Sequence, residues 1–358
     1  MRIIGHLDMD AFFAAIEERD HPQWRGLPLV VGADPAGGTG RGVAATANYP
    51  ARRYGIHSAM PITRAWRLSE AAKRRGQPGV IFLPPNFSRY EEVSRRIMEI
   101  IKKYSPLVEE ASIDEAYFDL TYAGDFARAA AICAQIKGEI RVRENLTASV
   151  GLGPNKLMAK IASDFKKPDG LTVIPPEEAE SFLAPLPVRK IPGIGPKTEN
   201  FLAQRGVKTV QDLKRFTREE LQEMFGKWGL DLYEKVRGRG SAVLATAYEP
   251  KSVGEQETFG RDTLDLPFIF ERLWAMCRRV HQRLLAETFS TYRTVVVTVR
   301  FADFETRSRA HTLPEPAASL RTLRFEAMKL FMPFLDVREN PKNKLIRLIG
   351  VRVEKLGK

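Results

Sequence analysis

The most informative stretch of this chain runs Glu110-Ala111-Ser112-Ile113-Asp114-Glu115-Ala116-Tyr117-Phe118-Asp119. It places two adjacent carboxylates, Asp114 and Glu115, in a segment whose flanks are typical of β-strands. Neighbouring side chains of a strand point to opposite faces, so both acids reach one site only at a turn or a strand end. The pattern therefore predicts a β-hairpin over residues 108–120.

A second apolar strand ends in acid at the start of the chain, Ile3-Ile4-Gly5-His6-Leu7-Asp8-Met9-Asp10. A single acid at a strand end is ordinarily solvated, but burying unpaired charge is costly, so two such strands are informative. Three carboxylates, from Asp8, Asp114 and Glu115, suit the hard-oxygen preference of Mg²⁺. We therefore expect a two-metal phosphoryl-transfer site.

Composition excludes several classes of protein. The chain has 358 residues, of which 44% are hydrophobic, enough for several cores. No apolar stretch reaches the roughly 18 residues of a membrane span, and no signal-peptide pattern opens the chain. The two cysteines, Cys133 and Cys277, lie far apart without metal-like spacing, which indicates a reducing cytoplasm.

The net charge is +12, and the basic excess is concentrated from Lys251 onward. Such a field favours polyanions. An anionic membrane surface would also attract it, but no basic amphipathic helix lies beside an apolar anchor.

Residues 1–175 alternate strand-like and helix-like patterns, typical of an α+β sheet with helices on one face. Asn155 is the predicted N-cap of the last of these helices. The expected strands are 3–9, 27–32, 42–47, 80–83, 108–120 and 147–152, and the expected helices are 12–18, 61–71, 89–104, 126–143 and 156–165.

The remainder divides into a helix-rich segment at 176–240, an extended linker at 241–250, and a strand-helix-strand-strand-helix-strand pattern from 251. In the strand at 292–304, Val295, Val297 and Val299 share one face, while Arg300 and threonines lie on the other. That polar face is either a phosphate-binding surface or simply solvated. The other expected strands are 252–260, 306–312 and 344–355, and the helices are 268–287 and 320–334.

Two further clusters have phosphate-binding chemistry. Ile191-Pro192-Gly193-Ile194-Gly195-Pro196-Lys197-Thr198 predicts a tight turn that exposes backbone N–H groups beside a helix start, as in helix-hairpin-helix modules, although a plain helix–helix loop would also fit. Tyr49, Arg52 and Arg53, with the lysines of Lys166-Lys167-Pro168-Asp169-Gly170, supply donors for a polyphosphate. Singly, such residues are usually solubilisers, so their role depends on the fold.

Taken together, these segments resemble the Y-family DNA polymerases, most closely the DNA polymerase IV (DinB) branch of translesion enzymes. The similarity extends across essentially the whole chain in the family's order. It is carried by Leu7-Asp8-Met9-Asp10-Ala11-Phe12-Phe13 and the residues to Glu17, Ala45-Thr46-Ala47-Asn48-Tyr49-x-Ala51-Arg52, Ala111-Ser112-Ile113-Asp114-Glu115-Ala116-Tyr117, Val150-Gly151-Leu152-Gly153-x-Asn155-Lys156, and Lys167-Pro168-x-Gly170.

The resemblance implies an α+β multidomain, right-hand polymerase with a ferredoxin-like palm, small fingers, a helical thumb with a helix-hairpin-helix, and a βαββαβ little finger. The implied limits are palm 1–11 and 80–175, fingers 12–79, thumb 176–240, linker 241–250 and little finger 251–358.

The resemblance also implies roles for individual residues. The metal ligands would be Asp8, Asp114, Glu115 and the backbone carbonyl of Met9; Asp10 is not expected to be a direct ligand. The incoming dNTP would meet Phe12, Thr46, Tyr49, Arg52 and Lys167, with Phe13 as the steric gate against a ribose, although sequence alone favours an ordinary core Phe there. A small-residue roof over the nascent base pair would use Gly42, Ala45 and Ala59, and DNA backbone contacts would use Gly193, Gly195, Lys197 and Arg300.

The implied activity is template-directed DNA synthesis past damaged bases with two Mg²⁺ ions, for which Mn²⁺ could substitute. We expect low fidelity, low processivity and no proofreading, in a cytoplasmic monomer that is nucleoid-associated if prokaryotic. The expected partners are primer-template DNA and dNTP, with no membrane. Relatives often end in a clamp-binding peptide that is not evident before Lys358, so either the natural chain is longer or a sliding clamp is contacted elsewhere.

Two alternatives stay open at this point. A two-metal nuclease needs similar carboxylates but a water nucleophile, and a non-catalytic DNA-binding protein needs only the hairpin and the basic C-terminal segment. Neither has a triphosphate to hold, so Tyr49, Arg52 and Lys167 favour the polymerase.

Overall fold

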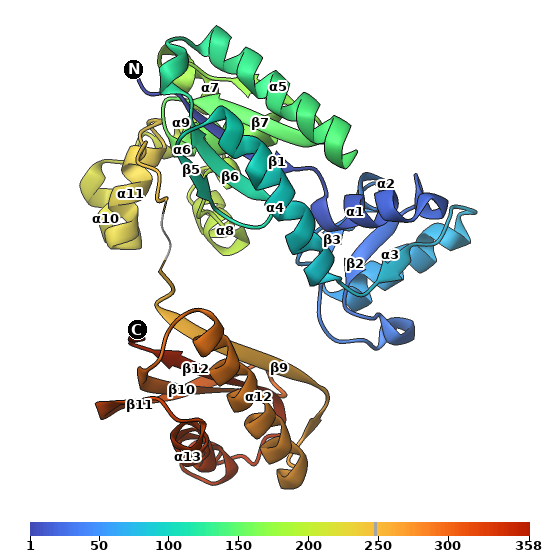
Figure 1. The fold of residues 1–358 in the computed structure, drawn as a ribbon, viewed down its shortest axis with the longest axis vertical. Helices are drawn as coiled ribbons and strands as arrows, with labels where there is room; N and C mark the ends of the chain where they lie inside the picture. The colour runs from blue at the N-terminus through green and yellow to red at the C-terminus, as the bar shows by residue number, and fades with distance from the viewer. Residues whose placement is uncertain (247–248) are drawn as a thin grey trace. The chain divides into compact units, whose positions relative to one another are not determined.

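A computed structural model describes residues 1–246 and 249–358 (Figure 1). Within these ranges the chain forms two compact units: residues 1–38 with 43–246, and residues 39–42 with 249–358. The expected linker includes 247 and 248, which lie outside the described residues. None of the helices in the described part of the chain is long and apolar enough to cross a bilayer.

The largest sheet of the first unit has the strand order β5-β6-β1-β7-β8. The central strand β1 pairs antiparallel with β6 and β7, and β7 pairs parallel with β8. The hairpin expected at 108–120 is confirmed as β5 and β6, whereas the short β8 was not expected from the sequence. The bounds are β1 Ile4–Met9, β5 Val108–Glu110, β6 Glu115–Asp119, β7 Ala148–Gly153 and β8 Leu171–Val173.

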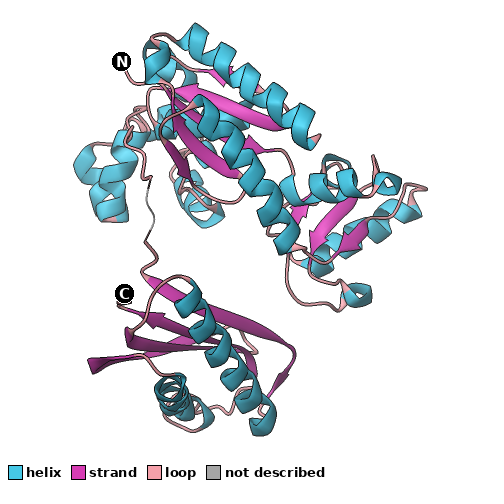
Figure 2. Cartoon of the chain, viewed as in Figure 1, coloured by secondary structure: helices cyan, strands magenta, loops and turns pink. Residues whose placement is uncertain are grey.

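Helices cover both faces of this sheet, unlike the single covered face that we expected from the sequence (Figure 2). Helices α4 (Phe87–Tyr104) and α5 (Phe126–Glu144) pack on the face that carries Leu7. Helix α6 (Lys156–Phe165) lies on the other face, against β7 and β1. A Cβ at Gly151 would lie 2.1 Å from the carbonyl oxygen of Ala159, so glycine is what allows α6 to lie directly on β7.

The N-cap expected for α6 is confirmed. The side chain of Asn155 accepts a hydrogen bond from the backbone N–H of Met158 at 3.0 Å, and its own amide donates to the carbonyl of Gly238 at 2.8 Å. The cap therefore fixes where α6 begins and ties that point to residue 238.

A smaller sheet in the same unit has the order β3-β2-β4. Strand β4 pairs parallel with β2, although the expected palm segment already began at residue 80. The four-residue helix α2 was not expected; its Pro50 lies in the first turn, where proline is tolerated. The bounds are α1 Phe12–Asp20, β2 Leu29–Gly32, β3 Ala44–Ala47, α2 Tyr49–Arg52, α3 Ile62–Arg74 and β4 Ile81–Leu83.

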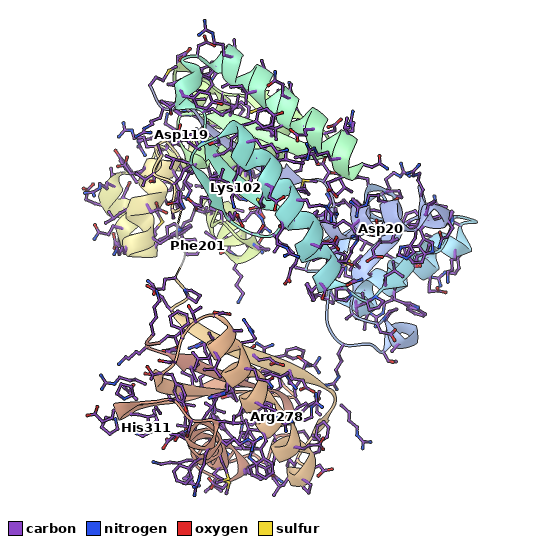
Figure 3. The ribbon with its side chains drawn as sticks, viewed as in Figure 1. Asp20, Lys102, Asp119, Phe201, Arg278 and His311 are labelled. Carbon is purple, nitrogen blue, oxygen red and sulfur yellow. The ribbon has the colours of Figure 1, made fainter. Side chains whose placement is uncertain are left out.

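Alternating charges join α1, α4 and α5 in a closed ring, which we call the charge ring. Its members are Arg19, Asp20, Arg89, Glu92, Arg96 and Glu144, and each contacts the next at 2.6–3.0 Å. Asp20 is labelled in Figure 3. Although partial burial opposes it, Arg89 and Arg19 lower the pKa of Asp20 to about 2. The ring fixes α1 against the two helices of the large sheet.

The helix-rich segment expected at 176–240 is confirmed, and its helices share a hydrophobic core with Leu157, Met158 and Ile161 of α6. The turn before α8 contains Gly193, whose φ of 103° favours glycine, and the Trp228 ring lies directly beside it. The helices are α7 Ala179–Leu183, α8 Pro196–Ala203, α9 Val210–Leu213, α10 Arg218–Phe225 and α11 Lys227–Lys235.

The second unit is an antiparallel sheet of order β11-β10-β12-β9 with two helices, and its βαββαβ order is the expected one. Val295, Val297 and Val299 are buried in one core with residues of both helices. The bounds are β9 Ser252–Thr263, α12 Leu266–Ala286, β10 Tyr292–Phe301, β11 Thr306–Ala317, α13 Leu320–Phe331 and β12 Ile346–Glu354.

Candidate active site

Asp8 and Glu115 lie directly opposite each other on β1 and β6. Directly paired residues of neighbouring antiparallel strands project from the same face, here the face that α6 covers. The backbone N–H of Met9 donates to the carbonyl of Asp114 at 3.0 Å, which extends the pairing to the hairpin tip. The strand register therefore brings all three expected carboxylates to one end of the sheet.

Ser112 shapes the hairpin tip. Its hydroxyl donates to the Asp114 carboxylate, while its oxygen accepts from the backbone N–H groups of Asp114 and Glu115 at 3.2 and 3.0 Å. Asp114 thus lies in a bend just before β6 rather than within a regular strand. This bend relaxes the alternation that would otherwise send the two adjacent acids to opposite faces.

Lys167 contacts the buried Asp8. Its ammonium lies 2.6 Å from Asp8 Oδ1 and 3.1 Å from Asp164. Burial raises the pKa of Asp8 to about 7, against the lowering effect of Lys167 and with a further increase from Glu115. Although burial opposes it, the Asp8 carboxylate raises the pKa of Lys167.

Glu115 has two nitrogen groups as neighbours. His6 Nε2 lies 3.6 Å from Glu115 Oε2, and the Lys160 ammonium donates to the same oxygen at 2.7 Å. Together they hold the pKa of Glu115 well below its ordinary value. Burial lowers the pKa of His6, whose Nδ1 is hydrogen-bonded to Ser163 at 2.7 Å.

The three carboxylates are neighbours but do not form a ready-made metal cluster. Among the residues that the structure describes, no three His, Cys, Asp or Glu side chains are grouped so as to hold an ion. The contacts above give the reason: Asp8 is turned to Lys167, Glu115 to Lys160, and Asp114 to Ser112. Each of the three carboxylates therefore has its own ammonium or hydroxyl partner.

The expected triphosphate residues of α2 lie together. The Arg52 guanidinium is 4.7 Å from the centre of the Tyr49 ring, and its Nε donates to the carbonyl of Ala47 at 2.9 Å. The Tyr49 hydroxyl donates to Asp10 at 3.4 Å, and burial, with Asp10, raises the pKa of Tyr49 to about 12. Thr46 is half-buried on β3.

The two aromatic residues at the start of α1 have different surroundings. Phe12 is buried in the core beside Leu7, so its side chain is a core residue. Phe13 is half-buried and stacks on Tyr90, with ring centres 4.4 Å apart and planes 11° from parallel. Phe13 therefore keeps part of its ring exposed while its orientation is fixed.

The remaining expected site residues are mostly at the surface. Gly42 and Ala59 are exposed with positive φ, and the Ala59 N–H donates to the carbonyl of Ala44, next to the half-buried Ala45. Lys197 is exposed in the first turn of α8, two residues after the half-buried Gly195; Gly193 is exposed. On β10 the half-buried Arg300 donates from Nε to Thr306 at 2.9 Å.

Two lysines of α6 that contact acids at this end of the sheet were not assigned a role from the sequence. Lys156 and Lys160 pair with Glu109 and Glu115, whereas Lys167, which the sequence did single out, pairs with Asp8 from the loop after α6. A signal was present, because lysines four residues apart project from one side of a helix. The sequence does not show that this side of the helix faces the sheet, because that depends on the close approach of α6 to Gly151.

Comparisons with known proteins agree with this geometry. The impB/mucB/samB family matches residues 7–164, its C-terminal domain matches 250–358, and the thumb domain of DNA polymerase iota matches 189–239. The chain is 43% identical to DNA polymerase IV of Methanoculleus marisnigri, over 99% of this chain and 94% of that one. It is 42% identical to DNA polymerase IV of Alkalilimnicola ehrlichii, over 99% and 95%.

Solved structures give the same result. A chimera of the Y-family polymerases Dbh and Dpo4 superposes with a TM-score of 0.86 at 31% identity, over 99% of both chains. An insertion ternary complex of Dbh DNA polymerase matches with a TM-score of 0.67, also at 31% identity and 99% of both chains. The chain therefore belongs to the Y family of DNA polymerases, on its DNA polymerase IV (DinB) branch, and is a DNA-directed DNA polymerase of the translesion type.

Proposed function

We propose that Asp8, Asp114, Glu115 and the Met9 carbonyl bind the divalent ions of this polymerase, and that these are two Mg²⁺ ions, for which Mn²⁺ can substitute. All four ligands are hard oxygens. The observation that carries the proposal is the pairing of Asp8 with Glu115 at the end of β1, with Lys167 on Asp8.

The residues fit such ions for a physical reason. The raised pKa of Asp8 reflects a buried carboxylate whose charge the neighbouring ammonium does not fully compensate. Lys160 and Lys167 already contact oxygens of this set, so the site favours cations. When bound, the two ions would activate the primer 3′-hydroxyl and neutralise charge on the triphosphate.

The chain's own residues would then bind and orient the nucleotide. Arg52, Tyr49 and Lys167 carry donors for the phosphates, with Thr46 nearby, and catalysis follows mainly from positioning and charge stabilisation. We assign Phe13 as the steric gate, because Tyr90 holds its half-exposed ring. Since the side chain of Phe12 is in the core, Phe12 would contact the nucleotide through its backbone.

We assign the nascent base-pair roof to Gly42, Ala45 and Ala59. Small side chains there would leave little steric penalty between correct and incorrect pairs, which supports low fidelity on damaged templates. We further propose low processivity and no proofreading, in a cytoplasmic monomer.

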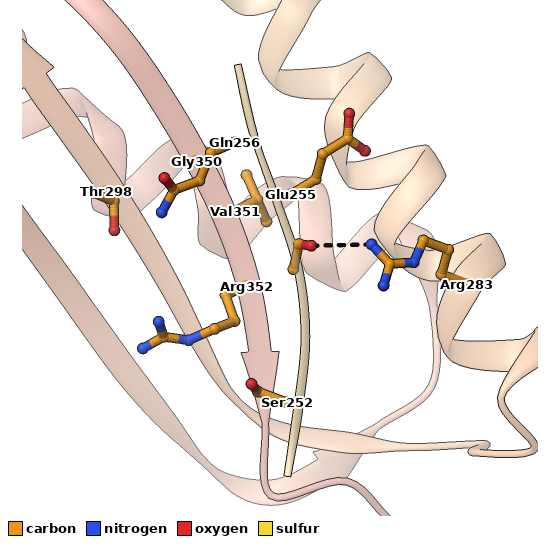
Figure 4. A pocket seen from close by; sticks show the side chains of 9 residues that line it. Ser252, Glu255, Gln256, Arg283, Thr298, Gly350, Val351 and Arg352 are labelled. Carbon is orange, nitrogen blue, oxygen red and sulfur yellow. Dashed lines mark hydrogen bonds between the residues drawn. The ribbon is translucent and has the colours of Figure 1, made fainter. Parts of the chain in front are cut away.

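DNA backbone contacts are assigned to two surfaces. The turn with Gly193 and Gly195, followed by Lys197, offers N–H groups and an exposed ammonium. In the second unit, the polar face of the sheet carries Arg300 and a hollow of about 350 Å³ lined by Gln256, Thr298 and Arg352 (Figure 4). Both surfaces suit phosphate rather than base recognition.

We also propose the domain limits given above, with one refinement. A separate hydrophobic core supports the little finger at 251–358, whereas the core of the thumb at 176–240 also includes residues of α6. Since β4 pairs with β2, the fingers would extend to Leu83 and the palm would resume after it.

Primer extension on a primed template with Mg²⁺ and dNTPs tests these assignments. Template-directed lengthening that is lost in Glu115→Gln supports the site. Primer shortening would favour a nuclease, and DNA binding without any change in primer length would favour a non-catalytic binding protein. Lengthening that persists in Glu115→Gln would refute the residue assignment while leaving the family untouched.

A further inference from the structure

Asp10 is a buried carboxylate that the proposed chemistry does not use. It lies one residue beyond β1 and is 3% exposed. Oδ1 accepts from the Ser149 hydroxyl at 2.8 Å and from the Tyr49 hydroxyl at 3.4 Å, while Oδ2 accepts from the backbone N–H of Asp169 at 2.8 Å. Within the described residues Asp10 forms no ion pair, so neutral donors alone stabilise its charge.

These donors come from three segments that are far apart in the sequence. Tyr49 belongs to α2, Ser149 to β7, and Asp169 to the loop that carries Lys167. The Ser149 oxygen also accepts from the backbone N–H of Gly170 at 3.2 Å. Two consecutive N–H groups of the loop are therefore tied to the Asp10–Ser149 pair.

Helix α5 holds the same loop from its other side. The Lys137 ammonium donates to the carbonyls of Asp169 and Gly170, the latter at 2.9 Å, and Arg141 pairs with the Asp169 carboxylate. With its N–H groups and carbonyls both bound, the loop has little freedom. Lys167, two residues before Asp169, is thereby held with its ammonium 2.6 Å from Asp8.

We propose that Asp10 is a positioning residue for nucleotide binding, which sets Tyr49 and Lys167 at a fixed separation on the two sides of the triphosphate. The inference rests on the proposed function, in which those two residues hold the phosphates. It differs from a ligand role, because three donors of the chain already occupy most of the roughly four acceptor sites of the Asp10 carboxylate.

The choice of residue supports this role. An amide at this position would keep one acceptor oxygen for Ser149 but would turn its NH₂ group toward the Asp169 N–H, donor against donor. Aspartate is the shortest side chain with acceptors on both sides. A buried carboxylate without a cationic partner is costly, so its two-sided acceptor capacity is the property that explains it.

The test is a kinetic comparison of Asp10→Asn with Tyr49→Phe, their double variant and Asp119→Asn. Asp119 is a matched control, a buried aspartate at the far end of β6 that accepts from Arg2 and Thr121. We expect Asp10→Asn to raise the KM for dNTP about tenfold, with a smaller change in kcat and unchanged DNA affinity. The control should lower thermal stability without changing KM.

The double variant separates positioning from general damage. If Asp10 acts through Tyr49, the two effects on KM overlap, and the double variant is little worse than the larger single one. Fully multiplying effects, or a loss of kcat with KM unchanged, would overturn the inference. Retained activity in Asp8→Asn would instead overturn the proposed function, so the two failures are distinguishable.

A second variant covers the case in which Asp10→Asn does not fold. Ser149→Ala removes one donor to Asp10 and leaves the Gly170 N–H without its acceptor. It should raise the KM for dNTP by a few-fold while DNA binding persists. An unchanged KM in a folded Ser149→Ala protein would count against the inference.

Discussion

Charged residues have different surroundings in the sheet of the palm and in the sheet of the little finger. All six residues of β1 are buried, because helices cover both faces of the palm sheet. In the little finger most of β11 is exposed, since α12 and α13 share a core with one face only. A charged residue is thus enclosed in the first sheet and solvated in the second.

The interaction partners of the charged residues also differ between the two sheets. Asp8 and Glu115 each meet a specific ammonium within the palm, and their pKa values are strongly shifted in opposite directions. Arg300 and Arg352 of the little finger meet a hydroxyl and a surface carboxylate, respectively. This difference fits the proposed function, in which the palm carries out local chemistry and the little finger attracts phosphate at long range.

Glu115→Gln or Asp114→Asn gives the largest expected effect. Each removes a charge from the proposed metal-binding end of the palm while keeping the shape of the side chain, so nucleotide incorporation should fall by at least about 10³-fold. DNA affinity, measured by fluorescence anisotropy, should remain essentially unchanged. Incorporation near the wild-type rate would contradict the assignment of these palm carboxylates to catalysis.

Phe13→Ala should have the next largest effect. The ring is held by stacking on Tyr90, so its removal should open space for a ribose hydroxyl. We expect the preference for dNTP over the ribonucleotide to fall on the order of 10²-fold, measured as a ratio of kcat/KM values. An unchanged sugar preference would show that Phe13 is only a core residue.

The pH dependence of metal activation tests the enclosure of Asp8. Its pKa of about 7 means that a proton competes with the cation below that pH, so the half-saturating Mg²⁺ concentration should fall about tenfold per unit as the pH rises toward 7, then level off. Because the pKa of Asp8 is raised from 3.8 to about 7, the metal-free protein should also become less stable as the pH rises from 3.8 to about 7. Mg²⁺ titrations from pH 6 to 8 provide the measurement; a flat response would contradict the burial argument.

Arg96→Ala tests charges of the first unit that hold the fold rather than the substrate. It leaves the buried Glu144 with Arg19 as its remaining partner in the charge ring. Arg96 is itself part-exposed, so we expect a loss of only about 1–2 kcal/mol in the free energy of unfolding. Arg128→Ala, which removes an exposed pair on α5, is the matched control and should cost less. Equal losses in urea denaturation would argue that the ring adds nothing.

The sequence predicted the parts of the fold that depend on local pattern. The hairpin, the N-cap at Asn155 and the order of the little finger follow from alternation, spacing and capping chemistry, and all three were confirmed. Sequence could not supply the contacts of Lys160 with Glu115, or of Asp10 with Tyr49. The first depends on helix α6 lying against Gly151, and the second on α2 lying next to the end of β1, which no periodicity records.

Arg300→Ala should have the smallest effect, and the effect should be similar on every template sequence. The side chain of Arg300 is half-buried and its Nε donates to Thr306, so we expect it to act as one positive charge among many. We expect DNA affinity to fall only a few-fold on every template sequence, with the slope of log affinity against log salt reduced by about 1. Arg278→Ala, exposed on α12, which packs on the other face of the sheet, is the control and should leave that slope unchanged. A strong sequence-dependent loss in Arg300→Ala would mean that the little finger, like the palm, encloses a specific contact.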